Sequence, residues 1–383
     1  MRRALSLLAI VLIFSLLPSP GQAADLKIGG KSALLMDVST GTILFESNAH
    51  EPLAPASVTK VMTMLLIMEA IDSGKTGWDD MVTASEEAAA KGGSQIYLKV
   101  GESLSVQDML KSIAVSSAND CACAMAEHIA GSESAFVEQM NSRAKELGMN
   151  DTHFVNCTGL DDSEEAKNHR TSAHDIAVMS RQLLKYHPDI KKFTTIWMDS
   201  VRNGAFGLSN TNKLIRFYEG ATGLKTGFTS GAGYCLSASA ARDGMELIAV
   251  VMGAEDSKIR FNACKTMLDH GFANYAVFQP DLCEAGEVPV TLGKTPSVQP
   301  RMGEASELLI EKSQRGSIST EIQLEEEVPA PVNQGQRLGT MLIKSGDQIL
   351  KEIPLVAAQG IDRLSFGNIC TKVLRKAAMA KEA

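Results

Sequence analysis

The first part of the chain changes between strand-like and helix-like patterns of apolar residues. Residues 33–46 hold two short apolar stretches on either side of a Ser-Thr-Gly turn, which predicts two strands. The segment from Ser57 to about Ile71 is apolar on nearly every side, which predicts a buried helix. Asp72-Ser73-Gly74 follows it and supplies residues that commonly end a helix.

Amphipathic patterns with helical spacing come next. Met109, Leu110 and Ile113 share one face of a helix that we expect to start near Ser105, with Asp108 three residues beyond the capping hydroxyl. Further helices are expected from about Asp120 to Ile129, from about Ser134 to Leu147 and from near Thr171.

Strand patterns return after the helices and continue up to the C-terminal tail. Residues 233–254 have the pattern of a hairpin with its turn at Arg242-Asp243-Gly244. Together with the helices before it, this predicts an α/β domain that ends near Phe278. From Glu284 onward, short alternating segments are separated by turn residues about every eight to twelve positions, which is typical of a small all-β domain.

The N-terminus has the pattern of a targeting segment. Arg2 and Arg3 precede an apolar run over residues 4–17, and small residues at 21–23 offer a cleavage site. We interpret residues 1–23 as a secretory signal peptide, with an uncleaved anchor as the alternative. The mature protein is therefore expected to start near Ala24 and to work outside the cytoplasm.

The C-terminus is a weakly amphipathic basic segment over residues 365–383. It could lie as a peripheral contact on an anionic membrane surface, or it could be a solvated tail. The expected division of the chain is a signal peptide over 1–23, an α/β domain over 24–278, a β-rich domain over 279–364 and the tail over 365–383.

Composition and charge exclude some classes of protein. Hydrophobic residues make up 44% of the chain and charged residues 21%, which is ordinary for a globular protein. The formal net charge is −8, and no basic stripe is present to neutralise phosphates, which argues against a nucleic-acid partner.

The cysteines and histidines do not predict a metal or a cofactor. The seven cysteines contain no CxxC pair, so even Cys121 and Cys123 are expected to be small buried side chains rather than redox groups. No HExxH motif is present, and His169 and His174 do not share a helical face, which argues against a zinc peptidase. The sequence names no disulfide pair.

The chemistry suggested by the sequence starts with Ser57 and Lys60. Three residues separate them, so on a helix their side chains share a face. A hydroxyl becomes a useful nucleophile when a neighbouring base takes its proton, and burial or a nearby cation can lower the pKa of a lysine enough for that role. A second S-x-x-K, at Ser142 and Lys145, has polar neighbours and is interpreted as an exposed helix face.

Two further motifs raise the specificity of this pattern. Ser117-Ala118-Asn119 lies in the break between two expected helices, where its side chains could point into a cleft or where Asn119 or Asp120 could cap the next helix. Lys225-Thr226-Gly227 leads into a strand pattern and offers a cation, a hydroxyl and a glycine that lets a substrate backbone approach. The copy at 75–77 lies in a turn with no strand after it, and it lacks the glycine of a phosphate loop.

The set S-x-x-K, S-x-N and K-T-G, in this order, is shared by penicillin-binding proteins and class A β-lactamases. With the flanking segments, the chain resembles the serine-type D-alanyl-D-alanine carboxypeptidases, which are low-molecular-mass penicillin-binding proteins. The resemblance runs from about Ala24 to about Gly360 and is carried by residues 33–63, 154–162, 223–236 and 330–343. It implies a β-lactamase/transpeptidase-like α/β domain, with helices on both faces of an antiparallel sheet, and a small all-β C-terminal domain.

The resemblance also implies roles for individual residues. Ser57 corresponds to the acylated nucleophile, Lys60 to its proton acceptor and Ser117 to a proton relay. Asn119, Lys225, Thr226, Gly227 and Thr229 correspond to substrate-binding residues, and the backbone N–H groups of Ser57 and Phe228 to an oxyanion hole. Ala118 replaces the aspartate of the S-D-N form but carries no catalytic atom.

The resemblance implies a reaction on the cell-wall side of a bacterial membrane that removes the terminal D-alanine from peptidoglycan stem peptides through an acyl-enzyme. It also implies that β-lactams acylate Ser57. In this reading, repulsion between Lys225 and Lys60 lowers the pKa of Lys60. A D,D-endopeptidase, a β-lactamase and a non-catalytic β-lactam sensor are the alternatives. Glu164 and Asn168 have the spacing of a β-lactamase deacylation motif but are interpreted as a solvated loop. A sensor should carry a membrane-spanning segment, and no apolar run of that length follows residue 24.

Overall fold

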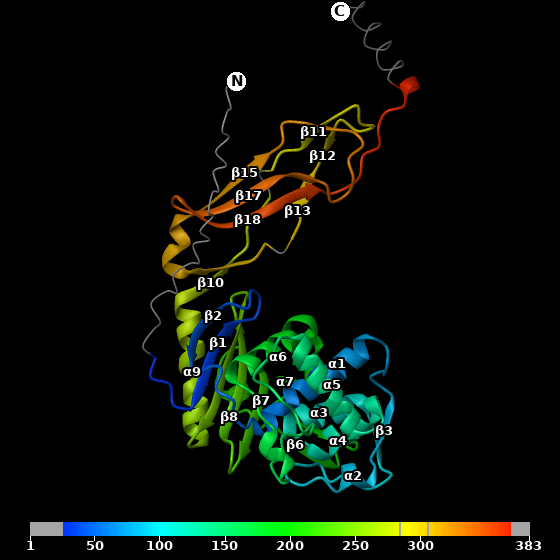
Figure 1. Ribbon diagram of the computed structural model, residues 1–383, viewed down its shortest axis with the longest axis vertical. Helices are drawn as coiled ribbons and strands as arrows, with labels where there is room; N and C mark the ends of the chain where they lie inside the picture. The colour runs from blue at the N-terminus through cyan, green and yellow to red at the C-terminus, as the bar shows by residue number, and fades with distance from the viewer. Residues whose placement is uncertain (1–25, 283–284, 305, 369–383) are drawn as a thin grey trace, which may run out of the picture.

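The computed structural model describes residues 26–282, 285–304 and 306–368, and these form an α/β part followed by a β-rich part (Figure 1). The expected signal peptide and most of the basic tail lie outside the described residues. Among the residues described, no helix is both long and apolar enough to span a bilayer.

The centre of the α/β part is a five-stranded antiparallel sheet. Its strand order is β2-β1-β9-β8-β7, so strands from both ends of this part of the chain are neighbours. The β8–β9 hairpin turns at residues 243–244, as the sequence predicts. The strands are β1 (Ser32–Asp37), β2 (Ile43–Ser47), β7 (Ala221–Thr229), β8 (Gly233–Arg242) and β9 (Met245–Ala254).

Helices cover both faces of this sheet because its strands alternate between two apolar cores. Leu34 and Val250 belong to the larger core, which contains the helices that follow β2, whereas Leu35 and Val251 face α9 on the other side. The principal helices are α1 (Lys60–Asp72), α3 (Val106–Ser116), α4 (Asn119–Ala130), α5 (Glu133–Glu146), α6 (Ala173–Tyr186) and α9 (Ser257–Asn274). This confirms the predicted antiparallel sheet with helices on both faces.

Short elements complete the α/β part. Two small hairpins are formed by β3 (Met81–Thr83) with β4 (Ser103–Ser105) and by β5 (Met198–Val201) with β6 (Phe206–Ser209). Single helical turns are η1 (Ala56–Thr59), α2 (Glu86–Ala89), η2 (Glu165–Asn168), η3 (Pro188–Ile190), α7 (Lys191–Thr194) and α8 (Leu214–Phe217).

The helix boundaries follow local capping chemistry. The Ser105 hydroxyl accepts a hydrogen bond from the backbone of Asp108 and caps α3, as predicted. Gly131 adopts a left-handed conformation at the end of α4. The helix predicted from Ser57 differs in detail, because residues 56–59 form the 3₁₀ turn η1 before α1 starts at Lys60.

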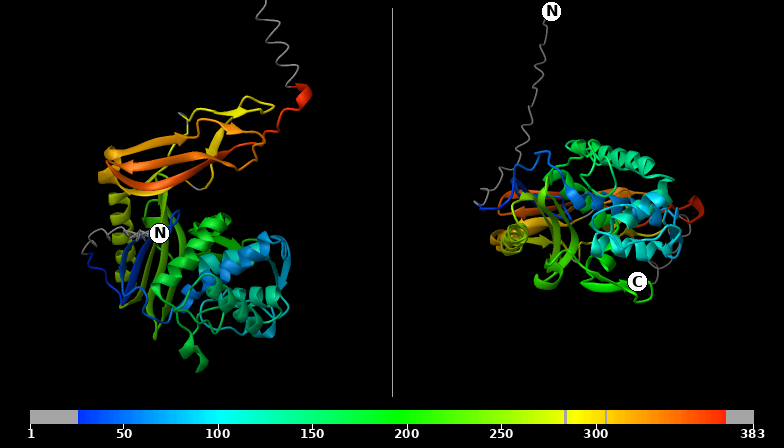
Figure 2. Two further views of the ribbon diagram at one scale, coloured as in Figure 1. Left: turned by 45° about the horizontal axis from the view of Figure 1, so that its top comes forward. Right: turned by 90° about the horizontal axis from the view of Figure 1, so that it is seen from below.

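The C-terminal part is all-β, as predicted, and lies beyond the C-terminal end of α9 (Figures 1 and 2). It follows directly after β10 (Tyr275–Phe278), which pairs with β14 (Leu308–Glu311). Its other strands form a three-stranded and a four-stranded sheet around two small apolar clusters. These strands are β11 (Val288–Thr291), β12 (Ser297–Val298), β13 (Pro300–Met302), β15 (Ile318–Leu324), β16 (Val328–Pro329), β17 (Arg337–Ser345) and β18 (Gln348–Ala357), and η4 (Lys312–Ser317) is a 3₁₀ turn among them.

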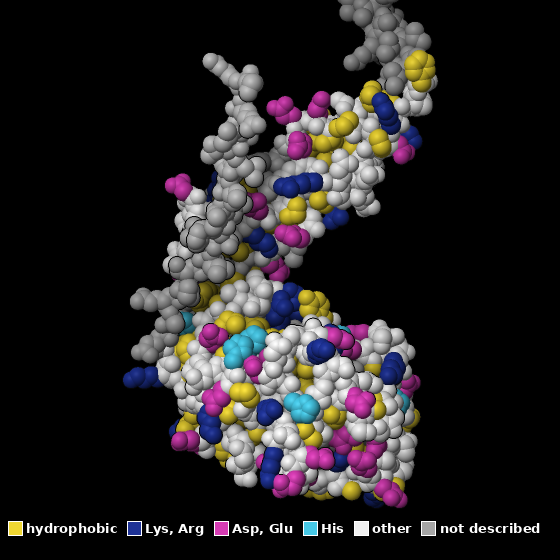
Figure 3. Space-filling model, in the orientation of Figure 1, with side chains coloured by type: hydrophobic (Ala, Val, Ile, Leu, Met, Phe, Trp, Pro, Cys, Tyr) yellow, Lys and Arg dark blue, Asp and Glu magenta, His cyan; other side chains and the backbone are white. Residues whose placement is uncertain are grey.

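The surface carries no extended region of one charge on the face shown in Figure 3. Acidic and basic side chains are interspersed over the α/β part, and the two parts of the chain are separated on one side by an open notch. This face therefore offers no focused electrostatic field to a highly charged polymer.

Candidate active site

Ser57 and Lys60 form a direct pair at the junction of η1 and α1. The Lys60 ammonium group donates a hydrogen bond of 3.0 Å to Ser57 Oγ and one of 2.8 Å to the carbonyl oxygen of Thr158. Side chains three residues apart lie almost directly above one another in a 3₁₀ turn, so this turn brings the pair together. The predicted pairing of hydroxyl and amine is present.

Lys60 is fully buried, and burial is the main cause of its altered basicity. Removal from water lowers the pKa of Lys60 to about 7, while Cys157 and Asp120 act in the opposite direction. The sequence argument assigned this effect to repulsion from Lys225, and the structure corrects that cause. The repulsion appears instead on Lys225, whose pKa is lowered by burial first, then by Lys60 and Arg260.

The K-T-G strand lies directly against the nucleophile. β7 is the outer strand of the central sheet, and it packs on η1. A Cβ atom at Gly227 would lie 2.6 Å from the carbonyl oxygen of Pro55 and 3.1 Å from the backbone nitrogen of Ser57. The glycine is therefore needed for the close approach of the chain to itself, whereas the sequence argument assigned it to the approach of a substrate.

The other residues of β7 differ in their surroundings. Lys225 is buried, and its ammonium group donates to the carbonyl oxygen of Thr226 at 2.8 Å. Thr229 Oγ1 accepts a hydrogen bond of 3.1 Å from the backbone of Ala232 in the β7–β8 turn. Phe228 is 54% exposed, and its ring packs against Tyr234 with centroids 4.3 Å apart.

Ser117 and Asn119 occupy the break between α3 and α4, as predicted. Ser117 adopts a left-handed conformation with φ of 65°, and its hydroxyl group has no hydrogen-bond partner within the described part of the chain. The Asn119 side chain donates to the carbonyl oxygen of Gly92 at 2.7 Å, while its own oxygen is buried without a partner. Asn119 is therefore not a helix cap.

Asp120 also differs from the expected helix cap. Its carboxylate accepts hydrogen bonds from the backbone of Ile96 and Leu98, in the loop before β4. It also accepts from the backbone of Cys121. Asp120 thus fixes this loop beside Asn119.

A threonine that the sequence argument missed connects the second and third motifs. Thr226 Oγ1 donates to Thr211 Oγ1 at 2.7 Å, and the backbone N–H of Thr211 donates to the carbonyl oxygen of Val115 near the end of α3. This chain of contacts joins β7 to the helix that ends at Ser117. No local sequence pattern marks Thr211, because its role depends on contacts between distant segments.

Two arginines were also missed. Arg260 on α9 donates to the carbonyl oxygens of Gly227 and Cys235, which are opposite each other on β7 and β8. Arg202, in the β5–β6 turn, donates to the carbonyl oxygens of Ile96 and Tyr97. It also makes a two-pronged ion pair with Glu102. The planar guanidinium group of arginine suits such multiple contacts. No sequence motif around Arg202 or Arg260 predicts these contacts.

The second copies of the S-x-x-K and K-T-G motifs lie on an exposed helix face and in a turn, as the sequence argument expects. Ser142 and Lys145 are both exposed on α5. Residues 75–77 lie in the turn after α1, where Thr76 contacts Asp80 and His128. Neither copy lies beside the Ser57–Lys60 pair.

Glu164 is exposed and pairs with Lys167 at 2.5 Å, which agrees with its interpretation as part of a solvated loop. His169 is buried, with Nε2 2.8 Å from Thr59 Oγ1, so it supports η1 structurally. Burial is the main cause that lowers the pKa of His169 to about 4.

The cysteines in the described part of the chain are free and buried, as expected: Cys121, Cys123, Cys157, Cys235 and Cys264. Cys283 and Cys370 lie outside the described residues. Glu87, Cys123 and Glu133 form a cluster of metal-ligand type within the described residues, but the Lys91 ammonium group already pairs with both carboxylates.

Comparison with known proteins agrees with this arrangement. Residues 19–256 match the model of the peptidase S11 family, D-alanyl-D-alanine carboxypeptidase, and residues 277–363 match the C-terminal domain of penicillin-binding protein 5. The D-alanyl-D-alanine carboxypeptidase DacF of Bacillus subtilis (strain 168) is 42% identical over 380 residues, which is 96% of each chain.

A solved structure and an endopeptidase are also similar to this chain. The structure of penicillin-binding protein 5 from Haemophilus influenzae matches with a TM-score of 0.75 and 30% identity, over 89% of this chain and all of that one. A D-alanyl-D-alanine endopeptidase of Pseudomonas aeruginosa is 32% identical over 228 residues, covering 57% of this chain and 69% of its own. The chain therefore belongs to the peptidase S11 family of serine-type D-alanyl-D-alanine carboxypeptidases.

Proposed function

We propose that Ser57 and Lys60 are the nucleophile and base of a D-alanyl-D-alanine carboxypeptidase that acts on peptidoglycan stem peptides. The observation that carries this proposal is the 3.0 Å hydrogen bond between them, made by a buried lysine with a pKa near 7. A lysine with this pKa is partly neutral near physiological pH and can accept a proton from the serine hydroxyl.

The reaction has two halves. Ser57 Oγ attacks the carbonyl carbon of the D-Ala–D-Ala bond while Lys60 takes the hydroxyl proton. Ser117, whose hydroxyl has no partner in the described part of the chain, relays the proton from Lys60 to the leaving amine as the peptide C–N bond breaks, and D-alanine departs. Water then attacks the acyl-enzyme, which releases the shortened stem peptide and restores the Ser57 hydroxyl.

Substrate binding is assigned to the β7 edge and to Asn119. Lys225, Thr226 and Thr229 bind the terminal carboxylate of the substrate, which would favour the charged form of Lys225. The buried, unpartnered oxygen of Asn119 is available to accept a peptide N–H group.

The oxyanion hole is assigned to the backbone N–H groups of Ser57 and Phe228. The contact between Gly227 and the Ser57 backbone supports this assignment, because Phe228 follows Gly227 directly. Donors fixed in this way typically contribute about 3 to 4 kcal/mol to transition-state stabilisation.

The first test measures D-alanine release from a peptide that ends in D-Ala–D-Ala. We expect activity in residues 24–383 and its loss in Ser57→Ala and Lys60→Ala. The matched controls are Ser142→Ala and Lys145→Ala, which change the exposed second S-x-x-K and should leave activity intact. Equal losses in both pairs would refute the assignment.

The second test separates the alternatives. A D,D-endopeptidase is favoured by the Pseudomonas relative and would cleave cross-linked peptides rather than release D-alanine. A β-lactamase would hydrolyse β-lactams rapidly, whereas we expect stable acylation of Ser57. The exposure of Glu164 and its pairing with Lys167 argue against a β-lactamase deacylation site.

Export and membrane contact complete the proposal. We infer that residues 1–23 direct export, that the catalytic domain ends near Phe278 and that the basic tail contacts the membrane peripherally. Binding of the purified chain to anionic vesicles, with a chain that ends at residue 364 as control, tests the tail. Equal binding of the two chains would refute its role.

A further inference from the structure

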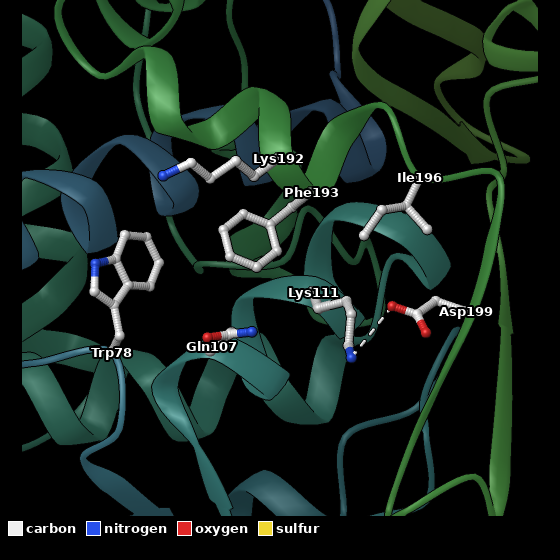
Figure 4. A pocket seen from close by; sticks show the side chains of 7 residues that line it. All are labelled: Trp78, Gln107, Lys111, Lys192, Phe193, Ile196 and Asp199. Carbon is white, nitrogen blue, oxygen red and sulfur yellow. Dashed lines mark ion pairs between the residues drawn. The ribbon is translucent and has the colours of Figure 1, made fainter.

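A pocket of about 270 Å³ lies in the helical region of the α/β part (Figure 4). Trp78 follows the C-terminal end of α1, whereas Lys60 starts that helix, and thirteen residues of α-helix span about 20 Å. The pocket shares no lining residue with the candidate active site. It is lined by Trp78, Gln107, Lys111, Lys192, Phe193, Ile196 and Asp199.

One side of the pocket is apolar. The rings of Trp78 and Phe193 stack with centroids 5.6 Å apart and planes 25° apart, and Ile196 lies beside Phe193 (Figure 4). This spacing leaves no room for a ligand between the two rings. Phe193 is buried, so the apolar surface that a ligand can reach is supplied by the half-buried Trp78 ring and by Ile196.

The other side of the pocket is polar but not strongly charged. The Lys111 ammonium group lies 3.1 Å from Asp108 and 3.3 Å from Asp199, so its charge is already balanced. Lys192 pairs with Asp189 at 2.7 Å. A phosphate or carboxylate ligand would therefore find no unpaired cation, whereas a neutral ligand with hydroxyl groups would find both donors and acceptors.

Gln107 adds an amide that is free to bind. Its side chain is exposed and makes no hydrogen bond with the described residues, although its backbone donates to the carbonyl oxygen of Trp78. An amide beside an aromatic surface matches the acetamido group of an N-acetylated sugar, which presents one carbonyl, one N–H and one methyl group.

We infer that this pocket binds an N-acetylated amino sugar of the glycan strand that carries the stem peptides. This inference rests on the proposed function, since it takes the glycan of the same polymer as the ligand. A second contact on one polymer raises the effective concentration of the stem peptide at Ser57. The pocket thus favours polymeric peptidoglycan over free peptides.

The test uses the small number of tryptophans in the chain, Trp78 and Trp197. The indole nitrogen of Trp197 is buried without a partner, so Trp197→Phe should fold and should leave Trp78 as the sole tryptophan, which is excited selectively at the red edge of the protein absorption band. Titration of this variant with a trimer of N-acetylglucosamine should change the Trp78 emission in a saturable way. Adding Gln107→Ala should weaken that binding about fivefold, as expected for one lost hydrogen bond.

Three controls make the outcome decisive. Phe366→Ala removes a side chain that is 82% exposed in the C-terminal part and should not change the titration. A D-Ala–D-Ala peptide without sugar should not change the Trp78 emission. The melting temperature of Gln107→Ala should match that of its parent, because its side chain makes no contact that folding requires.

A second readout uses insoluble peptidoglycan. Trp78→Leu and Gln107→Ala should reduce retention on the polymer and D-alanine release from it, with unchanged release from a soluble peptide. No response to the trimer, or retention equal to that of the parent, would overturn the inference. Failure of the parent to release D-alanine from the soluble peptide would instead overturn the proposed function.

Discussion

The Lys60 ammonium group lies 3.0 Å from Ser57 Oγ and 2.8 Å from the carbonyl oxygen of Thr158, in a site where water does not reach it. The two contacts fix the amine against the hydroxyl, and burial makes the amine more acidic than a surface lysine. Positioning and basicity therefore have one origin, which is the burial of the start of α1 between the sheet and the loop at Thr158.

The rate of acylation should rise with pH through about 7. Only neutral Lys60 can accept the Ser57 proton, and burial lowers its pKa to about that value. The measurement is kcat/KM for D-alanine release between pH 5 and 9. Lys145→Ala should leave the profile unchanged, and a flat profile between pH 6 and 8 would contradict this role for Lys60.

Lys60→Met should stabilise the fold most at low pH. The folded-state pKa of Lys60 lies below its unfolded value of 10.5, so between about 7 and 10.5 the unfolded chain binds more protons and stability rises with pH. Methionine carries no proton that must be released on folding. The melting temperature of Lys60→Met should therefore exceed that of the parent by an amount that shrinks as pH increases across this window. An advantage that grows with pH would contradict the burial of a protonatable amine.

Gly227→Ala should strongly reduce acylation. Its Cβ atom would lie 2.6 Å from the Pro55 carbonyl oxygen, so η1 must move away from β7, at a cost on the order of 1 to 3 kcal/mol. Gly207→Ala on β6 is the matched control, because a Cβ atom there meets no atom within 4 Å. The measurement is the rate of labelling by a fluorescent β-lactam, and equal rates in both variants would count against the close contact.

Arg202→Ala should raise KM more than it lowers kcat. The arginine anchors Ile96 and Tyr97 from outside, and the same loop supplies the carbonyl oxygen that binds the Asn119 amide. Loss of the arginine should make that loop more mobile. The Asn119 side chain, which is the proposed peptide-binding group, would then be held less firmly. Hydrogen exchange over residues 92–100 should increase in parallel.

Arg143→Ala is the control for this variant. Arg143 has nearly the same side-chain exposure, 23% against 22%, and also pairs with glutamates, but it lies on α5. A fall in kcat alone, or the same effect in both variants, would show that Arg202 does not act through the loop.

The sequence by itself determined the main elements and named the candidate reacting groups. The continuous apolar run after Lys60 specifies a buried helix, and the two apolar stretches around Arg242-Asp243-Gly244 specify a strand hairpin. Local rules of this kind need only neighbouring residues. They also predicted the Ser105 cap, which depends on a residue three positions away.

Sequence context already favoured one copy of each motif, but only the tertiary structure decided how the favoured copies are packed together. Ser57–Lys60 and Ser142–Lys145 have the same spacing, but one pair is packed against β7 and the other faces solvent. The basicity of Lys60, the reason for Gly227, and the contacts of Arg202 and Thr211 all depend on segments that are distant in sequence. Burial and long-range contact are properties of the packed chain, and no local pattern of residues contains them.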